Sequence, residues 1–283
     1  MTQLTHHQTP SATHRALDGE MIARYRRDGF LLLPPQFLTG DVLGRAHVAL
    51  PGVLRTTGPE RVLERDETTV RSVYGVHRID AEMGAVSRHP AVLGAVEQLV
   101  GDAAYIHQSK VNVKAPFAGD QWEWHQDFVY WLRNDGVARP DMVNVAVFLD
   151  EVTEFNGPLT FIPGSHTHGV LSGTTREEMP RGYEDSPSWV ATLTADEQFQ
   201  VAPQVISDLC AQRGMVSPKG PAGSVLFFHP NILHASSPNI SPRRRAMLLF
   251  VYNAVGNAPT SVPAARPQFL AETDTAALHP IAP

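Results

Sequence analysis

Two segments that lie far apart in the chain carry side chains able to bind one metal ion together. In the first, His125 and Asp127 stand two positions apart within the aromatic-rich run Trp-Glu-Trp-His-Gln-Asp-Phe-Val-Tyr-Trp, residues 122–131. Aromatic residues favour an extended strand, and residues i and i+2 of a strand face the same side. The imidazole and the carboxylate are therefore expected to project together. One nitrogen and one oxygen ligand make up two thirds of the facial triad that holds non-haem Fe(II), and a second histidine would complete it.

The second segment supplies a candidate for that histidine. His234 lies in Phe-Phe-His-Pro-Asn-Ile-Leu-His-Ala-Ser, residues 227–236, and stands 109 positions after His125 (234 − 125). Arg245 follows eleven positions later (245 − 234) and precedes the apolar run Ala-Met-Leu-Leu-Phe-Val-Tyr, which predicts a buried strand. A guanidinium near the end of such a strand can bind a carboxylate through two parallel hydrogen bonds, as a bound dicarboxylate would need.

Other interpretations of these residues stay open at this level. The His-x-Asp pattern is short and arises often by chance, in which case His125 is a hydrogen-bonded strand histidine and Asp127 a surface carboxylate. His166 and His168 also stand two apart, but a Pro-Gly pair just before them places them in a turn. A zinc hydrolase would use a similar ligand set with an open water position, and a catalytically silent binding protein could retain the same fold. The arginine after His234 and the aromatic residues around His125 favour oxidative chemistry.

The bulk properties exclude several classes of protein. The chain has 283 residues, of which 42% are hydrophobic and 18% charged, and this allows one large all-β domain or two smaller ones. Its formal charge of −6 and the lack of a dense Lys/Arg patch argue against a nucleic-acid partner. No apolar run approaches the roughly 18 residues of a membrane span, and the polar N-terminus lacks the core of a secretory signal. The lone cysteine, Cys210, excludes an intramolecular disulfide and indicates a cytoplasmic protein.

The order of predicted elements, helices first and many short strands later, is typical of a two-sheet jelly roll buttressed by N-terminal helices. Residues 1–16 are expected to be disordered, and the Pro- and Gly-rich stretch 171–222 is expected to be a lid or insert with its own helix. Helices are predicted at 18–27 with Asp18 as N-cap, from Thr39 onward, at 90–100 and at 203–212. Strands are predicted at 30–33, 105–113, 121–130, 142–149, 159–162, 224–228 and 247–251.

Taken together, several motifs resemble the phytanoyl-CoA dioxygenase family and, within it, the ectoine hydroxylases. The resemblance runs over nearly the whole chain from Asp-Gly-Phe at 28–30. It is carried by residues 71–77 (Arg-Ser-Val-Tyr-Gly-Val-His), 108–114, 124–128, 135–136, 156–159, 163–166 and 231–255. None of these motifs is specific alone, but the set is highly specific.

The resemblance implies a mainly β chain, a single double-stranded β-helix domain (jelly roll, cupin-like) over residues 17–283, that uses Fe(II), 2-oxoglutarate and O₂. By resemblance, the iron ligands are His125, Asp127 and His234. The contacts to 2-oxoglutarate are Arg245 and Ser236 on its distal carboxylate, with Asn112 as a further contact. The substrate contacts are Gln108 and Trp131.

Two departures from the ectoine hydroxylases alter the expected substrate. Met247 stands where those enzymes typically carry asparagine, and Leu249 where they carry phenylalanine, and both positions contact substrate there. Gln126 also replaces their usual serine. Losing a polar contact changes recognition, because a site built to hydrogen-bond one substrate discriminates through those partners. We therefore expect a hydroxylase of a small amino acid or cyclic imino acid, which Gln108 and Trp131 would contact. We place this activity in bacterial specialised metabolism. Ectoine itself is the alternative substrate. A homodimer is left open.

Overall fold

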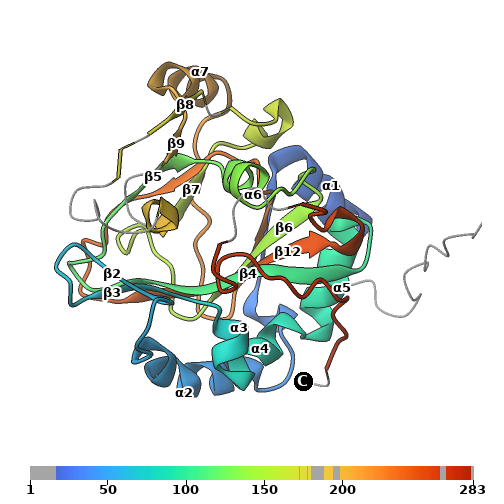
Figure 1. Cartoon of the computed structure of the whole chain (residues 1–283), viewed down its shortest axis with the longest axis vertical. Coiled ribbons are helices and arrows are strands. Elements are labelled where there is room, and N and C mark those ends of the chain that lie inside the picture. The colour runs from blue at the N-terminus through green and yellow to red at the C-terminus, as the bar shows by residue number, and fades with distance from the viewer. Residues whose placement is uncertain are drawn as a thin grey trace, which may run out of the picture.

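A seven-stranded antiparallel sheet forms the centre of the computed structural model, in the order β1-β10-β6-β12-β4-β3-β2 (Figure 1). A three-stranded antiparallel sheet, β5-β11-β7, lies beside it, and β8 pairs with β9. The strands are β1 (Phe30–Leu33), β2 (Arg61–Leu63), β3 (Val70–Tyr74), β4 (Ala104–Lys114), β5 (Trp122–His125), β6 (Met142–Phe148), β7 (Leu159–Phe161), β8 (Thr174–Thr175), β9 (Phe199–Gln200), β10 (Val225–Phe228), β11 (His234–Ser236) and β12 (Arg245–Ala254).

The structure describes residues 17–171, 173–176, 178–179, 188–193, 198–261 and 266–281. The predicted disordered tail, residues 1–16, lies outside this range, as does part of the predicted 171–222 insert. The α-helices are α1 (Gly19–Asp28), α2 (Val42–Leu54), α3 (Val76–Ile79), α4 (Ala81–Ser87), α5 (Pro90–Val100), α6 (Phe128–Asn134) and α7 (Pro203–Arg213). Short 3₁₀ turns occur at Pro35–Phe37, Ser165–His168, Ser188–Leu193 and Val255–Asn257.

Alternation along the strands gives the large sheet two different faces. On β6, Val143, Val145 and Val147 pack with the helices, whereas Ala146 and Phe148 pack toward the small sheet. This follows from the two-residue period of a strand. Figure 1 shows α2, α3, α4 and α5 on one side of the large sheet and the small sheet on the other. The predicted helical buttress and the mainly β class are therefore confirmed, as two packed antiparallel sheets with helices on one face.

Local capping chemistry explains where the N-terminal helices begin. The side chain of Asp18 accepts a hydrogen bond from the Met21 amide at 2.8 Å, so α1 starts with the predicted cap, and Gly29 ends it in the left-handed region (φ 83°). Helix α5 spans the predicted residues. The predicted start of the second helix at Thr39 is wrong, because α2 begins at Val42 after Asp41. The Thr39 amide instead donates a hydrogen bond to Nε2 of His89 at 3.2 Å, and Thr39 lies in the turn before the helix.

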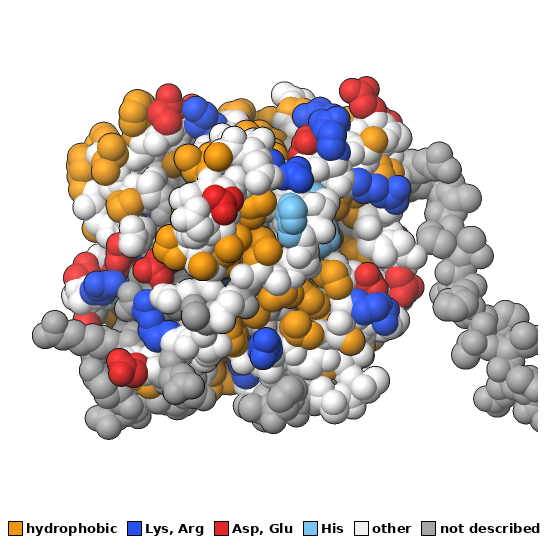
Figure 2. Space-filling view, turned by 90° about the horizontal axis from the view of Figure 1, so that it is seen from above, with side chains coloured by type: hydrophobic (Ala, Val, Ile, Leu, Met, Phe, Trp, Pro, Cys, Tyr) orange, Lys and Arg blue, Asp and Glu red, His pale blue; other side chains and the backbone are white. Residues whose placement is uncertain are grey.

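The outer surface mixes charges of both signs. On the face seen in Figure 2, basic and acidic side chains of the described residues are interspersed with hydrophobic ones rather than gathered by sign. Within the described part of the chain, no helix combines the length and the apolar character needed to cross a membrane.

Candidate metal centre

Three potential ligands meet between the two sheets, as the sequence predicted. His125 ends β5 and His234 begins β11, and the two residues are directly paired across these antiparallel strands. The Nε2 atom of His125 lies 3.7 Å from Oδ1 of Asp127, and Nε2 of His234 lies 3.8 Å from Oδ2. One ligand atom from each residue lies within 4.8 Å of the others. Two imidazoles and one carboxylate thus converge in the two-histidine, one-carboxylate pattern typical of non-haem iron.

Asp127 reaches this point by a different route from the predicted one. We expected residues 121–130 to form one strand, but β5 ends at His125 and α6 begins at Phe128. Asp127 has helical backbone angles (φ −67°, ψ −38°) and precedes α6. Trp122 and Trp124 lie in β5 as predicted, but the later aromatic residues of the run are buried in α6, where Phe128 and Trp131 pack in one cluster with Val251 of the large sheet. Tertiary packing has overridden the strand propensity of these residues.

Hydrogen bonds on the outer ring nitrogens orient both imidazoles. Nδ1 of His125 lies 2.7 Å from the Glu123 carbonyl oxygen, and Nδ1 of His234 lies 3.1 Å from the Ile232 carbonyl oxygen. An Nδ1–H donated to a carbonyl leaves Nε2 with its lone pair directed at the centre, as a metal ligand requires. Burial lowers the pKa of His234 to about 4, with the neighbouring His125 adding to the effect. The ring is therefore neutral at pH 7.

The carboxylate is held ionised and in place. Burial opposes ionisation of Asp127, but His234 and His125 outweigh it and keep the pKa of this carboxyl well below its usual range. Nδ2 of Asn144 donates a hydrogen bond to Oδ2 of Asp127 at 2.9 Å. Asn144 lies on the face of β6 turned to the small sheet. Such an outer partner fixes the orientation of a metal-binding carboxylate.

A second group of polar atoms lacks partners deeper in the structure. Arg245 is fully buried at the start of β12, and its Nη2 donates to the Gly157 carbonyl oxygen at 2.7 Å. Its Nε and Nη1 atoms, Oγ of Ser236 and Oδ1 of Asn112 have no hydrogen-bond partner among the described residues. Burial, followed by repulsion from Arg71, lowers the pKa of Arg245 to about 9, so it remains a cation at neutral pH. Buried polar atoms are normally paired. The two guanidinium nitrogens and the Ser236 hydroxyl are hydrogen-bond donors and therefore fit an anionic ligand.

The cavity at the triad contains most of the predicted substrate contacts. Its lining includes Gln108, Trp131 and Leu249 together with the three metal-ligating residues. Met247 is buried in the apolar cluster between the sheets and is not among the lining residues. The described part of the predicted 171–222 insert contributes Leu193 to the adjoining pocket.

Several cavity residues were missed from the sequence. Lys110 lines the cavity between Gln108 and Asn112 on β4, and the two-residue period of that strand is a signal that could have found it. Arg266 also lines the pocket with His125. It comes from an irregular C-terminal segment with no motif, so no sequence signal pointed to it.

The comparisons with known proteins agree with this geometry. The model of the family Phytanoyl-CoA dioxygenase (PhyH) matches residues 25–247. The chain belongs to this family. It is 40% identical over 258 residues to L-proline trans-4-hydroxylase of Streptomyces griseoviridis, covering 91% of this chain and 94% of that protein. It is 34% identical over 249 residues to ectoine dioxygenase of Bordetella bronchiseptica, covering 86% of this chain and 77% of that protein.

Solved structures of EctD from S. alaskensis share the fold. The form with bound Fe matches with a TM-score of 0.78 and 28% identity, covering 97% of this chain and 90% of that one. The form with 2-oxoglutarate and 5-hydroxyectoine matches with a TM-score of 0.79 and 28% identity, covering 97% and 91%. The resemblance inferred from the sequence motifs is therefore confirmed, both for the family and for the ectoine hydroxylases within it.

Proposed function

We propose that this protein is an Fe(II)- and 2-oxoglutarate-dependent hydroxylase of a small cyclic imino acid or amino acid, with L-proline as the leading substrate. The observation that carries the proposal is one interior site that combines two features. His125, Asp127 and His234 converge there, and the fully buried Arg245 leaves two nitrogens without a partner among the described residues. We further propose that residues 17–283 form one double-stranded β-helix domain around this site.

The donor set fits a ferrous ion. His125, Asp127 and His234 would hold it, and a facial triad leaves positions for a chelating co-substrate and for O₂. When bound, iron with 2-oxoglutarate and O₂ supplies the oxidation that converts a substrate C–H bond into C–OH, with succinate and CO₂ as co-products. The protein's own contribution is to orient the reactants and to exclude water. The apolar cluster of Phe161, Phe228 and Leu249 beside the triad serves the second task.

Arg245 suits the distal carboxylate of 2-oxoglutarate. The contact to Gly157 leaves Nε and Nη1 as unpaired donors, and each can donate a charge-assisted hydrogen bond to a carboxylate. Ser236 stands two residues after His234 on β11 and therefore faces the same side of that strand, so its buried hydroxyl can add a third hydrogen bond. Asn112, on the cavity face of β4, is a further contact.

Arg266 suits the carboxylate of an amino-acid substrate. Its side chain is only 6% exposed and lines the pocket with His125 and Gln108. Asp135 accepts from its Nε and Nη2 at 2.7 and 2.6 Å, so Nη1 is the nitrogen not used by this pair. Trp131 forms an apolar wall of the same pocket. A small ring with a carboxylate, such as proline, matches these groups, and the similarity to an L-proline hydroxylase supports this substrate class.

A turnover screen tests the proposal. Purified protein loaded with Fe(II) is incubated with 2-oxoglutarate and L-proline, other small amino acids or ectoine, and succinate is measured. We expect succinate formation that depends on L-proline, is lost with a chelator, and is accompanied by a product one oxygen atom heavier. Zinc-dependent hydrolysis with no response to 2-oxoglutarate would instead support a metal hydrolase, and binding without turnover a silent protein.

A matched pair of variants checks the iron assignment. Asp127→Asn removes the charge of the carboxylate with little change in shape and is expected to abolish turnover. Asp141→Asn makes the same chemical change at a surface ion pair with Arg139 and is expected to keep wild-type activity. Full activity of Asp127→Asn would remove the metal assignment.

A further inference from the structure

The residues that follow Arg266 are fastened to the strand that lines the substrate pocket. The C-terminal strap, defined here as residues 266–272, makes two contacts with β4. The Glu272 amide donates to the His107 carbonyl oxygen at 2.9 Å, and Nε2 of Gln108 donates to the Leu270 carbonyl oxygen at 2.8 Å. Leu270 is fully buried against Tyr74 and Leu193. Figure 1 shows this C-terminal segment passing over β4 toward the helices.

A β-bulge on β4 makes this double attachment feasible. The register between β12 and β4 shifts from Val251↔Gln108 to Tyr252↔Ile106, which leaves His107 as the extra residue. A bulge re-aims side chains that would otherwise point to opposite faces. Gln108 can therefore bind the strap while Nε2 of His107 lies 2.9 Å from Oδ2 of Asp135.

Asp135 connects this bulge to the guanidinium in the pocket. The carboxylate is 1% exposed, receives both hydrogen bonds from Arg266 and contacts His107. Asp135 therefore fixes the orientation of the Arg266 guanidinium. The position of the Arg266 backbone is set separately by the strap, because Arg266 is the first residue of the strap.

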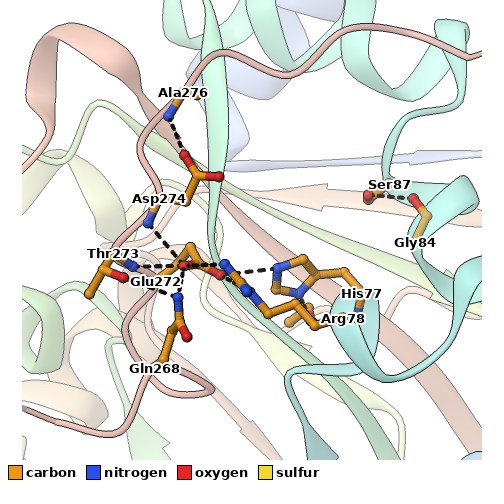
Figure 3. Close-up of polar contacts among 10 residues, drawn as sticks. His77, Arg78, Gly84, Ser87, Gln268, Glu272, Thr273, Asp274 and Ala276 are labelled. Atoms are coloured by element: carbon orange, nitrogen blue, oxygen red, sulfur yellow. Dashed lines mark hydrogen bonds and ion pairs between the residues drawn. The ribbon is translucent and has the colours of Figure 1, made fainter.

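Glu272 anchors the other end of the strap (Figure 3). Its carboxylate accepts hydrogen bonds from Arg78 Nη2 at 2.8 Å, from Gln268 Nε2 at 2.8 Å, and from the amides of Thr273 and Asp274 at 2.8 and 3.0 Å. The neighbouring His77, on α3 with Arg78, places Nε2 3.4 Å from the same carboxylate.

The carboxylate of Glu272 is well suited to act as an anchor. Its side chain is 4% exposed. Burial alone would raise its pKa, but the hydrogen bonds from Arg78 and from the backbone outweigh burial and lower the pKa to about 2. His77 Nδ1 lies 2.6 Å from Oγ of Ser109, the residue after Gln108 on β4. The anchor therefore joins α3, β4 and the strap in one polar network.

We infer that Glu272 is a positioning residue that latches the strap onto α3 and thereby sets where Arg266 stands in the substrate pocket. The inference rests on the proposed function in one respect, namely that Arg266 receives the substrate carboxylate. Glu272 itself does not line the pocket. Its effect is therefore expected on the binding of the amino acid rather than on the co-substrate.

The test compares Glu272→Gln with Asp274→Asn. Both change a carboxylate to an amide on the same segment, but Asp274 accepts only the Ala276 amide in the described structure. With L-proline as probe, Glu272→Gln is expected to raise KM about 10- to 100-fold, the value of one hydrogen bond to a charged group. Its kcat and its KM for 2-oxoglutarate are expected to stay within about threefold of wild type. Asp274→Asn is expected to match wild type.

A double variant separates positioning from general damage. If Glu272 acts through Arg266, the pair Arg266→Gln and Glu272→Gln raises KM no further than Arg266→Gln alone, because coupled residues are not additive. Should Glu272→Gln fail to fold, Arg78→Gln removes the ion pair with Glu272 at a side chain that is half-exposed. This variant is also expected to raise the KM for L-proline. Equal kinetics for Glu272→Gln and Asp274→Asn, or a wild-type KM in Arg78→Gln, overturns the inference and leaves the proposed function standing.

The role of Glu272 can also be tested if the proposed function is wrong. If wild type shows no turnover of L-proline, the substrate assignment is wrong, and amide hydrogen exchange then tests whether Glu272 holds the strap in place. Faster exchange at the Leu270 and Glu272 amides in Glu272→Gln than in Asp274→Asn supports the latch. Equal exchange in the two variants overturns it.

Discussion

Replacing Arg245 with methionine should separate co-substrate binding from stability. The guanidinium is fully buried, donates to the Gly157 carbonyl oxygen, and leaves Nε and Nη1 without partners among the described residues. Methionine has a similar volume and no charge, although its side chain is shorter. The variant therefore removes the proposed 2-oxoglutarate contacts without opening a large cavity.

The expected magnitude follows from these two nitrogens. A hydrogen bond to a charged group contributes about 1.5–3 kcal/mol, and two such bonds to one carboxylate are not fully additive. A loss of about 3 kcal/mol raises the KM for 2-oxoglutarate by about two orders of magnitude. Without co-substrate, the free energy of unfolding is expected to rise by about 1 kcal/mol, because the variant no longer buries a cation with unpaired N–H groups.

Two assays check this prediction. Succinate formation is followed against 2-oxoglutarate concentration, and urea unfolding is measured with and without 2-oxoglutarate. Arg244→Met is the matched control, because Arg244 is the preceding residue and pairs with Asp150 near the surface. It is expected to keep the KM of wild type. If Arg245→Met binds 2-oxoglutarate as tightly as wild type, or loses stability without it, Arg245 is not the carboxylate ligand.

Three further predictions follow. Asn144→Leu removes the hydrogen bond to Asp127 and is expected to weaken Fe(II) binding about 10- to 100-fold, as measured by anaerobic Fe(II) titration; an unchanged affinity would contradict the positioning role. Leu249→Phe, at the predicted substrate contact that lines the cavity, is expected to shift the ratio of kcat/KM from L-proline toward ectoine about tenfold, and an unchanged ratio would show that this position does not select the substrate. Burial, with two neighbouring arginines, lowers the pKa of Lys114 from 10.5 to about 6. Between these values only the unfolded chain binds the proton, so the free energy of unfolding rises with pH by up to about 1.4 kcal/mol per pH unit. Lys114→Met should flatten this rise in urea titrations at about pH 6.5 and about pH 8.5, and an equal slope in the two proteins would refute the assigned ionisation.

The types of the metal-ligating residues and much of the fold could be predicted from the sequence because their signals are local. The two-residue period of strands such as β6 and β12 follows from one buried face. The cap at Asp18 and the Pro90 start of α5 follow from the unpaired amides of a helix end. That His234 joins His125 was inferred from the known ligand set of iron, whereas the pairing of the two residues across β5 and β11 came from the structure.

Only the tertiary structure decided how the site is completed. Asp127 reaches the triad because the chain turns into α6 after β5. Strand propensity did not predict this turn, because the aromatic side chains from Phe128 onward are buried by tertiary packing of a helix. Arg266 enters the pocket from a segment without regular structure. The bulge residue His107 is linked to this segment by its contacts with Asp135 and with the Glu272 amide. Periodicity and propensity depend on near neighbours in the chain, whereas these contacts join residues up to 194 positions apart and follow from packing alone.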